Sequence, residues 1–227
     1  MLIHLPEVLT ADELARVRDI LEHAPWQDGR ITAGSIAAQA KNNLQLDDFC
    51  AESNAARDIV LGALERNATF FTAALPKRIF PPLFNRYTGS SNSFGSHVDN
   101  AVRTIRGTPQ RVRTDLSATL FVSEPQDYDG GELVIEDTYG THSAKLAAGD
   151  MVLYPSSSLH HVTPVTRGTR TACFMWMESM VRELDRRRLL YEMDLNIMEM
   201  RAQVGDIEPV MKMTSVYHNL LRMWAST

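Results

Sequence analysis

The chain has 227 residues, of which 44% are hydrophobic and 22% charged, and its net charge is −5. This composition is typical of a globular protein with a sizeable core, and it excludes a chain that is disordered throughout. The modest negative charge argues against nucleic-acid binding by the chain as a whole. Two cysteines, Cys50 and Cys173, are too few for a disulfide framework. The sequence shows no signal-peptide pattern and no apolar run of membrane-spanning length, so we expect a cytoplasmic protein with no membrane partner.

The first part of the chain, residues 1–78, is predicted to be a helical region that packs on the core. Thr10 followed by Glu13 has the pattern of a capping box, and apolar residues recur at helical spacing after it. We therefore expect a helix over residues 11–24. A second helical pattern runs from about residue 53 to residue 74 and stops before Pro76.

The middle of the chain, residues 79–178, has the texture of a β-structure. Short β-rich runs occur at residues 83–87, 117–122, 131–136, 151–154 and 169–177, and turn-forming residues separate them. Such spacing favours a sandwich or barrel over alternating strands and helices. Two pairs, Gly130-Gly131 and Gly149-Asp150, are predicted to be hairpin turns.

Helical spacing returns in the last part, residues 179–227. It predicts a long helix that breaks near Gly205 and a final helix over residues 210–225. Residues 186–188 are three arginines, which we expect on a solvated helix face. The apolar stripe of these helices fits either packing on the core or a seam between copies of the chain.

Two histidines and a carboxylate carry the first indication of chemistry. In His97-Val98-Asp99, residues i and i+2 of a strand share a face, so imidazole and carboxylate can converge. Taken alone, the pair also fits a hydrogen-bonded pair on the surface. His160 follows between two β-rich runs, ten residues before Arg170.

Arg170 opens the most hydrophobic predicted strand. Alternation along it places Arg170, Ala172, Phe174 and Trp176 on one face and Thr171, Cys173, Met175 and Met177 on the other. An arginine on an inward apolar face needs an anion, because burying an unpaired charge is costly. That anion is either a core carboxylate or a bound ligand, and the neighbouring runs contain few acidic residues.

Two histidines with one carboxylate are the facial triad of non-haem Fe(II) oxygenases, which leaves three coordination positions open. A guanidinium fork suits a carboxylate that is held by two parallel hydrogen bonds. A dicarboxylic keto acid fits both features, because one end chelates the metal while the other binds Arg170. These residues therefore favour a hydroxylase over a zinc hydrolase.

Ordered motifs over residues 83–177 resemble those of one enzyme family. They are Tyr87-Thr88-Gly89, His97-Val98-Asp99-Asn100, Gly130-Gly131-Glu132-Leu133, Gly149-Asp150, His160, Arg170 and Trp176. The set resembles the prolyl-hydroxylase branch of Fe(II)/2-oxoglutarate dioxygenases. With its helical tail, the whole chain resembles the bacterial PKHD-type hydroxylases, which are often associated with iron uptake.

The resemblance implies an α+β fold whose core is a double-stranded β-helix, or jelly roll, flanked by N-terminal helices and a C-terminal helical extension. It implies His97, Asp99 and His160 as Fe(II) ligands and catalytic residues, and Arg170 as the anchor of 2-oxoglutarate. Tyr87 matches a tyrosine that lines the co-substrate pocket. O2 and an unidentified substrate would then react with release of succinate and CO2, with L-ascorbate as reductant.

The chain departs from some relatives at one position, since Phe121 lies on the strand where they carry a tyrosine hydroxyl. Thr119 or another donor would have to replace that hydrogen bond. Next to His160, His161 competes for the third ligand position, and the family spacing to Arg170 favours His160. Only one of the two can bind, because neighbours on a strand face opposite ways.

Several readings stay open at this point. The arginine-rich residues 101–114 fit either a mobile lid or a solvated loop. The same metal site would also serve demethylation or ring oxidation of a small metabolite. From other classes, a non-catalytic metal-binding barrel that senses iron or oxygen, or a structural interaction module, fits part of the pattern, but neither needs Arg170 as a keto-acid anchor. A homo-oligomer through the C-terminal helices is one further expectation.

Overall fold

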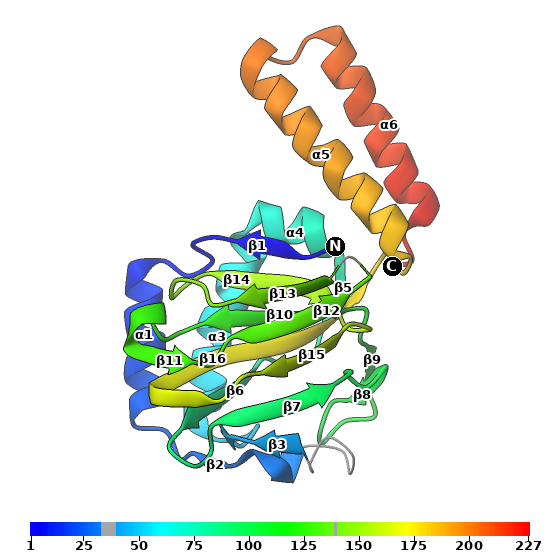
Figure 1. Ribbon diagram of the computed structural model, residues 1–227. Coiled ribbons are helices and arrows are strands. Elements are labelled where there is room, and N and C mark those ends of the chain that lie inside the picture. The colour runs from blue at the N-terminus through cyan, green and yellow to red at the C-terminus, as the bar shows by residue number, and fades with distance from the viewer. Residues whose placement is uncertain (33–39, 139) are drawn as a thin grey trace.

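The computed structural model describes residues 1–32, 40–138 and 140–227. It contains a jelly-roll core of two facing antiparallel sheets, with helices on the outer side of the larger sheet and a helical arm at one end (Figure 1). The α+β class and the double-stranded β-helix expected from the sequence are confirmed.

The larger sheet has the order β1-β14-β10-β16-β6-β4-β2, and β5 and β11 also pair with β16. Its strands are β1 (Ile3–Leu5), β2 (Gln27–Asp28), β4 (Leu44–Gln45), β5 (Pro76–Ile79), β6 (Leu83–Thr88), β10 (Leu116–Phe121), β11 (Tyr128–Gly130), β14 (Met151–Pro155) and β16 (Val165–Ser179). The smaller sheet has the order β13-β12-β15-β7-β3. Its strands are β3 (Lys41–Asn42), β7 (Ser93–His97), β12 (Leu133–Asp137), β13 (Gly140–Ala144) and β15 (Leu159–Val162).

A separate hairpin consists of β8 (Val102–Thr104) and β9 (Arg111–Arg113). The helices are α1 (Ala11–Glu22), α3 (Ala51–Arg66), α4 (Ala68–Ala74), α5 (Leu184–Val204) and α6 (Glu208–Trp224), with short 3-10 turns η1 (Gly29–Thr32) and η2 (Pro125–Asp127). None of the helices within the described residues combines the length and the apolar character needed to cross a membrane.

The N-terminal part is less helical than the sequence suggested. Helix α1 starts with the expected capping box of Thr10 and Glu13. The single helix predicted over residues 53–74 is wrong, because Asn67 leaves the helical conformation and its side chain accepts a hydrogen bond from the backbone N–H of Phe70, which caps a new helix, α4. Strands β1, β2 and β4 are part of the larger sheet and β3 is part of the smaller one, so this part of the chain contributes strands to both sheets. The division of the chain at residues 78 and 178 stays a prediction.

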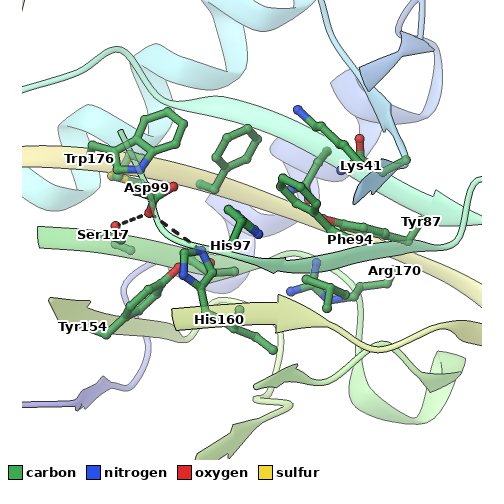
Figure 2. A pocket seen from close by; sticks show the side chains of 18 residues that line it. Lys41, Tyr87, Phe94, His97, Asp99, Ser117, Tyr154, His160, Arg170 and Trp176 are labelled. Carbon is green, nitrogen blue, oxygen red and sulfur yellow. Dashed lines mark hydrogen bonds and ion pairs between the residues drawn. The ribbon is translucent and has the colours of Figure 1, made fainter. Parts of the chain in front are cut away.

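One face of strand β16 lines a pocket, and the other face packs in the main apolar cluster. Its inward side chains Arg170, Phe174 and Trp176 line a pocket between the sheets (Figure 2). The alternate residues Cys173 and Met177 belong to the main apolar cluster, together with buried residues of α1 and α3. The predicted alternation along this strand is confirmed.

The two expected hairpin turns connect different sheets instead. Gly130 and Gly131 join β11 of the larger sheet to β12 of the smaller, and Gly149 precedes β14 on the way back. Gly130 has φ +70°, and a Cβ there would lie 2.0 Å from the carbonyl oxygen of Pro164. Glycine is required because neither the backbone angle nor the space admits a side chain. Local sequence cannot distinguish a turn within a sheet from a crossover between sheets.

Helices α5 and α6 form a C-terminal hairpin that projects from one end of the core (Figure 1). The two helices pack on each other through Leu190, Ile197, Val210 and Tyr217, and this cluster continues to Leu75 and Val181 at the base. Other apolar side chains of the hairpin stay exposed, among them Leu189, Met198, Val204, Met211, Val216 and Met223. The predicted stripe therefore divides into a hairpin core and an exposed face.

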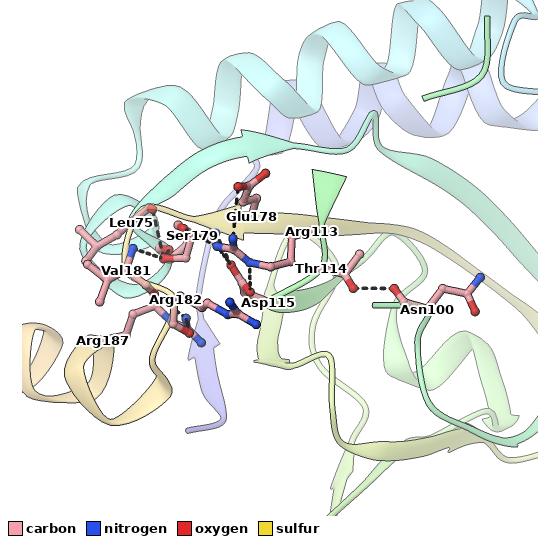
Figure 3. Close-up of polar contacts among 11 residues, drawn as sticks. Leu75, Asn100, Arg113, Thr114, Asp115, Glu178, Ser179, Val181, Arg182 and Arg187 are labelled. Carbon is pink, nitrogen blue, oxygen red and sulfur yellow. Dashed lines mark hydrogen bonds and ion pairs between the residues drawn. The ribbon is translucent and has the colours of Figure 1, made fainter. Parts of the chain in front are cut away.

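The joint between the core and the C-terminal hairpin also contains polar contacts (Figure 3). The Ser179 hydroxyl donates to the Ala74 carbonyl at 2.8 Å, and Arg187 Nη1 donates to the carbonyls of Val181 and Arg182 at 2.7 and 2.8 Å. Arg187 is only 2% exposed. The expectation of a solvated face at residues 186–188 is therefore wrong for Arg187, which secures the first turn of α5.

Truncation after Glu178 tests the role of the C-terminal hairpin. It removes the cover of Leu75 and the Ser179 hydrogen bonds, so we expect an aggregated protein or one with a clearly lower Tm. Size-exclusion chromatography and thermal unfolding give the measurement. A soluble and active 1–178 fragment contradicts this prediction.

Candidate metal centre

Three side chains with metal-binding atoms meet between the sheets. His97 ends β7, His160 lies opposite it on the neighbouring strand β15, and Asp99 follows His97 by two residues. One ligand atom from each of the three side chains lies within 4.8 Å of the others. The His160 and Asp99 side chains are only 6% and 8% exposed. The structure therefore brings together the three residues expected from the sequence (Figure 2).

Backbone contacts fix the tautomer of both imidazoles. Nδ1 of His97 lies 2.8 Å from the Gly95 carbonyl, and Nδ1 of His160 lies 3.0 Å from the Ser158 carbonyl. Because a carbonyl oxygen only accepts, Nδ1 carries a hydrogen in each ring, which makes Nε2 the nitrogen available to a metal. Burial, with a smaller contribution from His160, lowers the pKa of His97 to about 4. The ring is thus neutral at pH 7, as a metal ligand must be.

Two serines support the carboxylate. The Ser117 hydroxyl donates to Asp99 Oδ2 at 2.6 Å, and the Ser156 hydroxyl lies 2.7 Å from Ser117 Oγ. Since the Ser117 hydrogen goes to Asp99, Ser156 donates to Ser117. Thr114 donates to the carbonyl of Asn100, the residue after Asp99, at 2.5 Å (Figure 3). These contacts restrict the orientation of Asp99 before any metal binds.

His161 is not part of this cluster. It pairs with Val134 across β12, and its Nδ1 is buried without a hydrogen-bond partner among the described residues. Alternation along β15 turns its ring away from the face that His160 shares with His97. The donor set that faces the pocket is two imidazoles and one carboxylate, which is the set that non-haem Fe(II) prefers.

Arg170 lies in the same pocket, on the side of the two histidines away from Asp99 (Figure 2). It is 1% exposed and lies over the rings of Tyr87 and Phe121, at 5.2 and 5.3 Å from their centroids. Among the described residues, its Nε and Nη1 atoms have no hydrogen-bond partner and no carboxylate forms an ion pair with it. A buried cation in this state calls for an anionic ligand.

Tyr87 and Thr119 complete the wall near Arg170. Tyr87 pairs with Arg170 across β6 and β16, and burial raises the pKa of its hydroxyl. Thr119 is 6% exposed and lines the pocket, whereas Phe121 contacts Arg170 through its ring and has no hydroxyl. Strand β10 therefore presents the Thr119 hydroxyl to the pocket, on the strand where some relatives carry a tyrosine hydroxyl.

Residues from the N-terminal part also reach the pocket, and sequence reasoning missed them. Lys41 and Asn43 line it, although they lie more than 50 residues before His97. The Lys41 ammonium donates to Gln45 Oε1 at 2.6 Å, and burial lowers its pKa to about 8. Only the pairing of β3 with β7 and of β4 with β6 brings these residues to the site. No local pattern signals that pairing.

The arginine-rich residues 101–114 form the hairpin β8–β9, which is attached to the pocket wall. The Arg103 guanidinium lies 3.8 Å from the centroid of Trp176, and Arg106 forms an ion pair with Asp47 at 3.3 Å. Arg113 pairs with Asp115 at 2.8 Å at the foot of the hairpin. These contacts exclude a wholly solvated loop, while movement as a lid stays a prediction.

The fold and this triad define the class of the protein. Residues 82–178 match the family model of the 2OG-Fe(II) oxygenase superfamily, and residues 185–226 match that of the PKHD-type hydroxylase C-terminal domain. A PKHD-type hydroxylase of Variovorax paradoxus is 59% identical over 99% of both chains. One of Nitrosomonas europaea is 56% identical over the full length of both. The chain belongs to the PKHD-type hydroxylase family, a family of oxidoreductases.

Solved structures agree with the fold. A prolyl-4-hydroxylase of Pseudomonas putida superposes with a TM-score of 0.52 at 20% identity, over 78% of this chain and 92% of its own. A prolyl hydroxylase of Trichoplax adhaerens superposes with a TM-score of 0.56 at 15% identity, over 83% and 86% of the two chains. At this identity the likeness establishes the fold alone.

The two adjacent histidines provide a matched pair for testing the metal site. We expect His160→Ala to lose metal binding, because it removes one of three ligands, and His161→Ala to retain it. Calorimetric titration with Mn(II) of the purified variants gives the measurement, with circular dichroism to check the fold. Loss of binding in His161→Ala with full binding in His160→Ala would show that the ligand assignment is wrong.

Ser117→Ala tests the support of Asp99. Removal of a hydrogen bond to a ligating carboxylate is expected to weaken metal binding by about 10- to 100-fold. The same Mn(II) titration measures the change, and Ser143→Ala, on the exposed strand β13, is the control. Equal affinities in the two variants contradict a role for Ser117.

Proposed function

We propose that this protein is an Fe(II)- and 2-oxoglutarate-dependent dioxygenase that hydroxylates its substrate and releases succinate and CO2. The observation that carries the proposal is Arg170, a buried guanidinium that shares a pocket with the triad and whose Nε and Nη1 have no hydrogen-bond partner in the part of the chain that the structure describes. A metal sensor needs the triad but not a buried cation beside it. A keto acid with two carboxylates uses both.

His97 and His160, through Nε2, and Asp99, through its carboxylate, would hold the Fe(II). Bound there, the metal supplies the activation of O2 that is coupled to oxidative decarboxylation of the keto acid. Arg170 would hold the distal carboxylate of 2-oxoglutarate by two parallel hydrogen bonds, with Tyr87 beside it. This would hold the keto acid in one orientation, with its keto end toward His97, Asp99 and His160.

The pocket wall near the triad is largely aromatic. Phe94 stacks on His97 with ring centroids 3.8 Å apart, and Tyr154 contacts His160 edge-on at 5.2 Å. Phe174 and Trp176 line the opposite side from β16. Such a wall restricts the access of water to the triad.

The substrate class stays open between a residue of a protein and a small molecule. Among the similar structures, one is a prolyl hydroxylase in complex with a peptide fragment, and another is HygX of Streptomyces hygroscopicus with hygromycin B bound. From the family resemblance we infer a link to iron uptake and the use of L-ascorbate as reductant. A cytoplasmic location and a homo-oligomer through the C-terminal hairpin are part of the same proposal.

Succinate formation tests the function most directly. Purified protein with Fe(II), 2-oxoglutarate and ascorbate is expected to form succinate under air, and more of it when the true substrate is present. Chromatographic detection of succinate, with the His160→Ala variant as control, gives the measurement. Metal binding without any succinate, with or without candidate substrates, would favour the alternative of a non-catalytic iron or oxygen sensor.

Arg170 provides the sharpest variant. Arg170→Ala should weaken 2-oxoglutarate binding by about 2–5 kcal/mol, the range for truncating one partner of a buried charge pair. Arg170→Lys should retain only part of the affinity for 2-oxoglutarate, since an ammonium cannot form two parallel hydrogen bonds to a carboxylate. Titration of the anaerobic Fe(II) protein, followed by charge-transfer absorption, measures both. An unchanged dissociation constant in Arg170→Ala would locate the anion elsewhere.

A further inference from the structure

A polar row crosses the larger sheet on its inward side. Arg170 pairs with Tyr87 across β16 and β6, and Leu44 of β4 pairs with Arg86 of β6. One step beyond Leu44, this register places Asn43 next to Tyr87. The row therefore reads Asn43, Tyr87, Arg170, and all three side chains line the pocket of the triad.

Asn43 is buried without the hydrogen bonds that its amide requires. It is 2% exposed, and both Oδ1 and Nδ2 lack a hydrogen-bond partner among the described residues. A buried amide without partners is destabilising and is rare in native proteins. Arg170, two positions along the row, has two buried nitrogens in the same condition. Unsatisfied donors that share one pocket wall indicate a common ligand.

The packing around Asn43 orients its amide. A Cβ on Gly29 would lie 1.9 Å from Asn43 Oδ1, so the oxygen end rests against the backbone of Gly29. The amide also lies beside the Tyr87 hydroxyl. The donor group, Nδ2, is thus turned toward the row that ends at Arg170.

A carboxylate accepts about four hydrogen bonds, which a single guanidinium fork does not supply. The Thr119 hydroxyl interacts with Tyr154, and Phe121, where some relatives have a tyrosine, offers no donor on this wall. We propose that Asn43 supplies it: Asn43 Nδ2 donates to the distal carboxylate of 2-oxoglutarate next to Arg170 and Tyr87. This assignment rests on the proposed function. It makes the N-terminal part of the chain, outside residues 82–178, a contributor to the co-substrate site.

Asn43→Leu provides a test in which stability and affinity are expected to move in opposite directions. Leucine has a similar shape and removes two unsatisfied buried polar atoms, so the Tm of the apoprotein should be retained or rise. The dissociation constant for 2-oxoglutarate should increase by about tenfold or more, as expected for a lost hydrogen bond to a charged group. A residue with only a structural role would lower the Tm instead.

The titration uses the anaerobic Fe(II) protein and its charge-transfer absorption, with 2-oxoglutarate and with 2-oxobutyrate, which lacks the distal carboxylate. The expected result is weaker binding of 2-oxoglutarate and unchanged binding of 2-oxobutyrate in Asn43→Leu. Asn42→Ala, an exposed neighbour, is the control and should resemble the wild type. Asn43→Asp, which keeps the shape but replaces the donor by a negative charge, should weaken 2-oxoglutarate binding at least as much.

The outcomes separate the two proposals. If the wild type does not bind 2-oxoglutarate, the proposed function fails. If the wild type binds it and Arg170→Ala weakens it, but Asn43→Leu or Asn43→Asp does not, the role of Asn43 alone is overturned. Equal weakening of both keto acids also overturns it, because the substitution would then act on the metal and not on the distal carboxylate.

Discussion

The alternation of side chains along β16 is the constraint on which the core and the site both depend. This strand of 15 residues pairs with β5, β6, β10 and β11, so its position is fixed from both edges. Its outward residues complete the main apolar cluster, and its inward residues include Arg170. A shift by one residue would exchange the two sets and place a guanidinium among leucines and valines. Packing of the outward apolar residues of β16 therefore keeps the Arg170 guanidinium buried on the inward face.

The two sheets divide the chemistry between them. The smaller sheet supplies the imidazoles from β7 and β15, while the larger supplies Arg170 and Tyr87 from β16 and β6. A ligand that binds both ends of the pocket must therefore bridge the two sheets. The buried charge and the unsatisfied amide are destabilising on their own, so a dianion bound to them would add stability to the folded state as well as complete the site.

The sequence predicted the parts of the site that local spacing determines. His97 and Asp99 share a face because they are two residues apart. Alternation along the apolar strand around Arg170 predicted that its side chain points inward. Ser117 was within a predicted strand, but its bond to Asp99 depends on the order of strands across the sheet. Asn43 gave no signal, because short strands such as β3 and β4 have no periodicity to read. The break at Asn67 and the burial of Arg187 were missed for a related reason, since a cap and a joint are decided by tertiary contacts.

The first strand of the chain has a distant partner. Ile3 of β1 pairs with Leu153 of β14, so almost the whole jelly roll must be synthesised before β1 has an edge to join. Closing a loop of this length has a large entropic cost, and topologies with many such contacts fold slowly. During translation the apolar residues Ile3 and Leu5, both buried in the final structure, emerge long before their partners do. Synthesis and assembly thus run in opposite orders, because the strand made first is among the last that can pair.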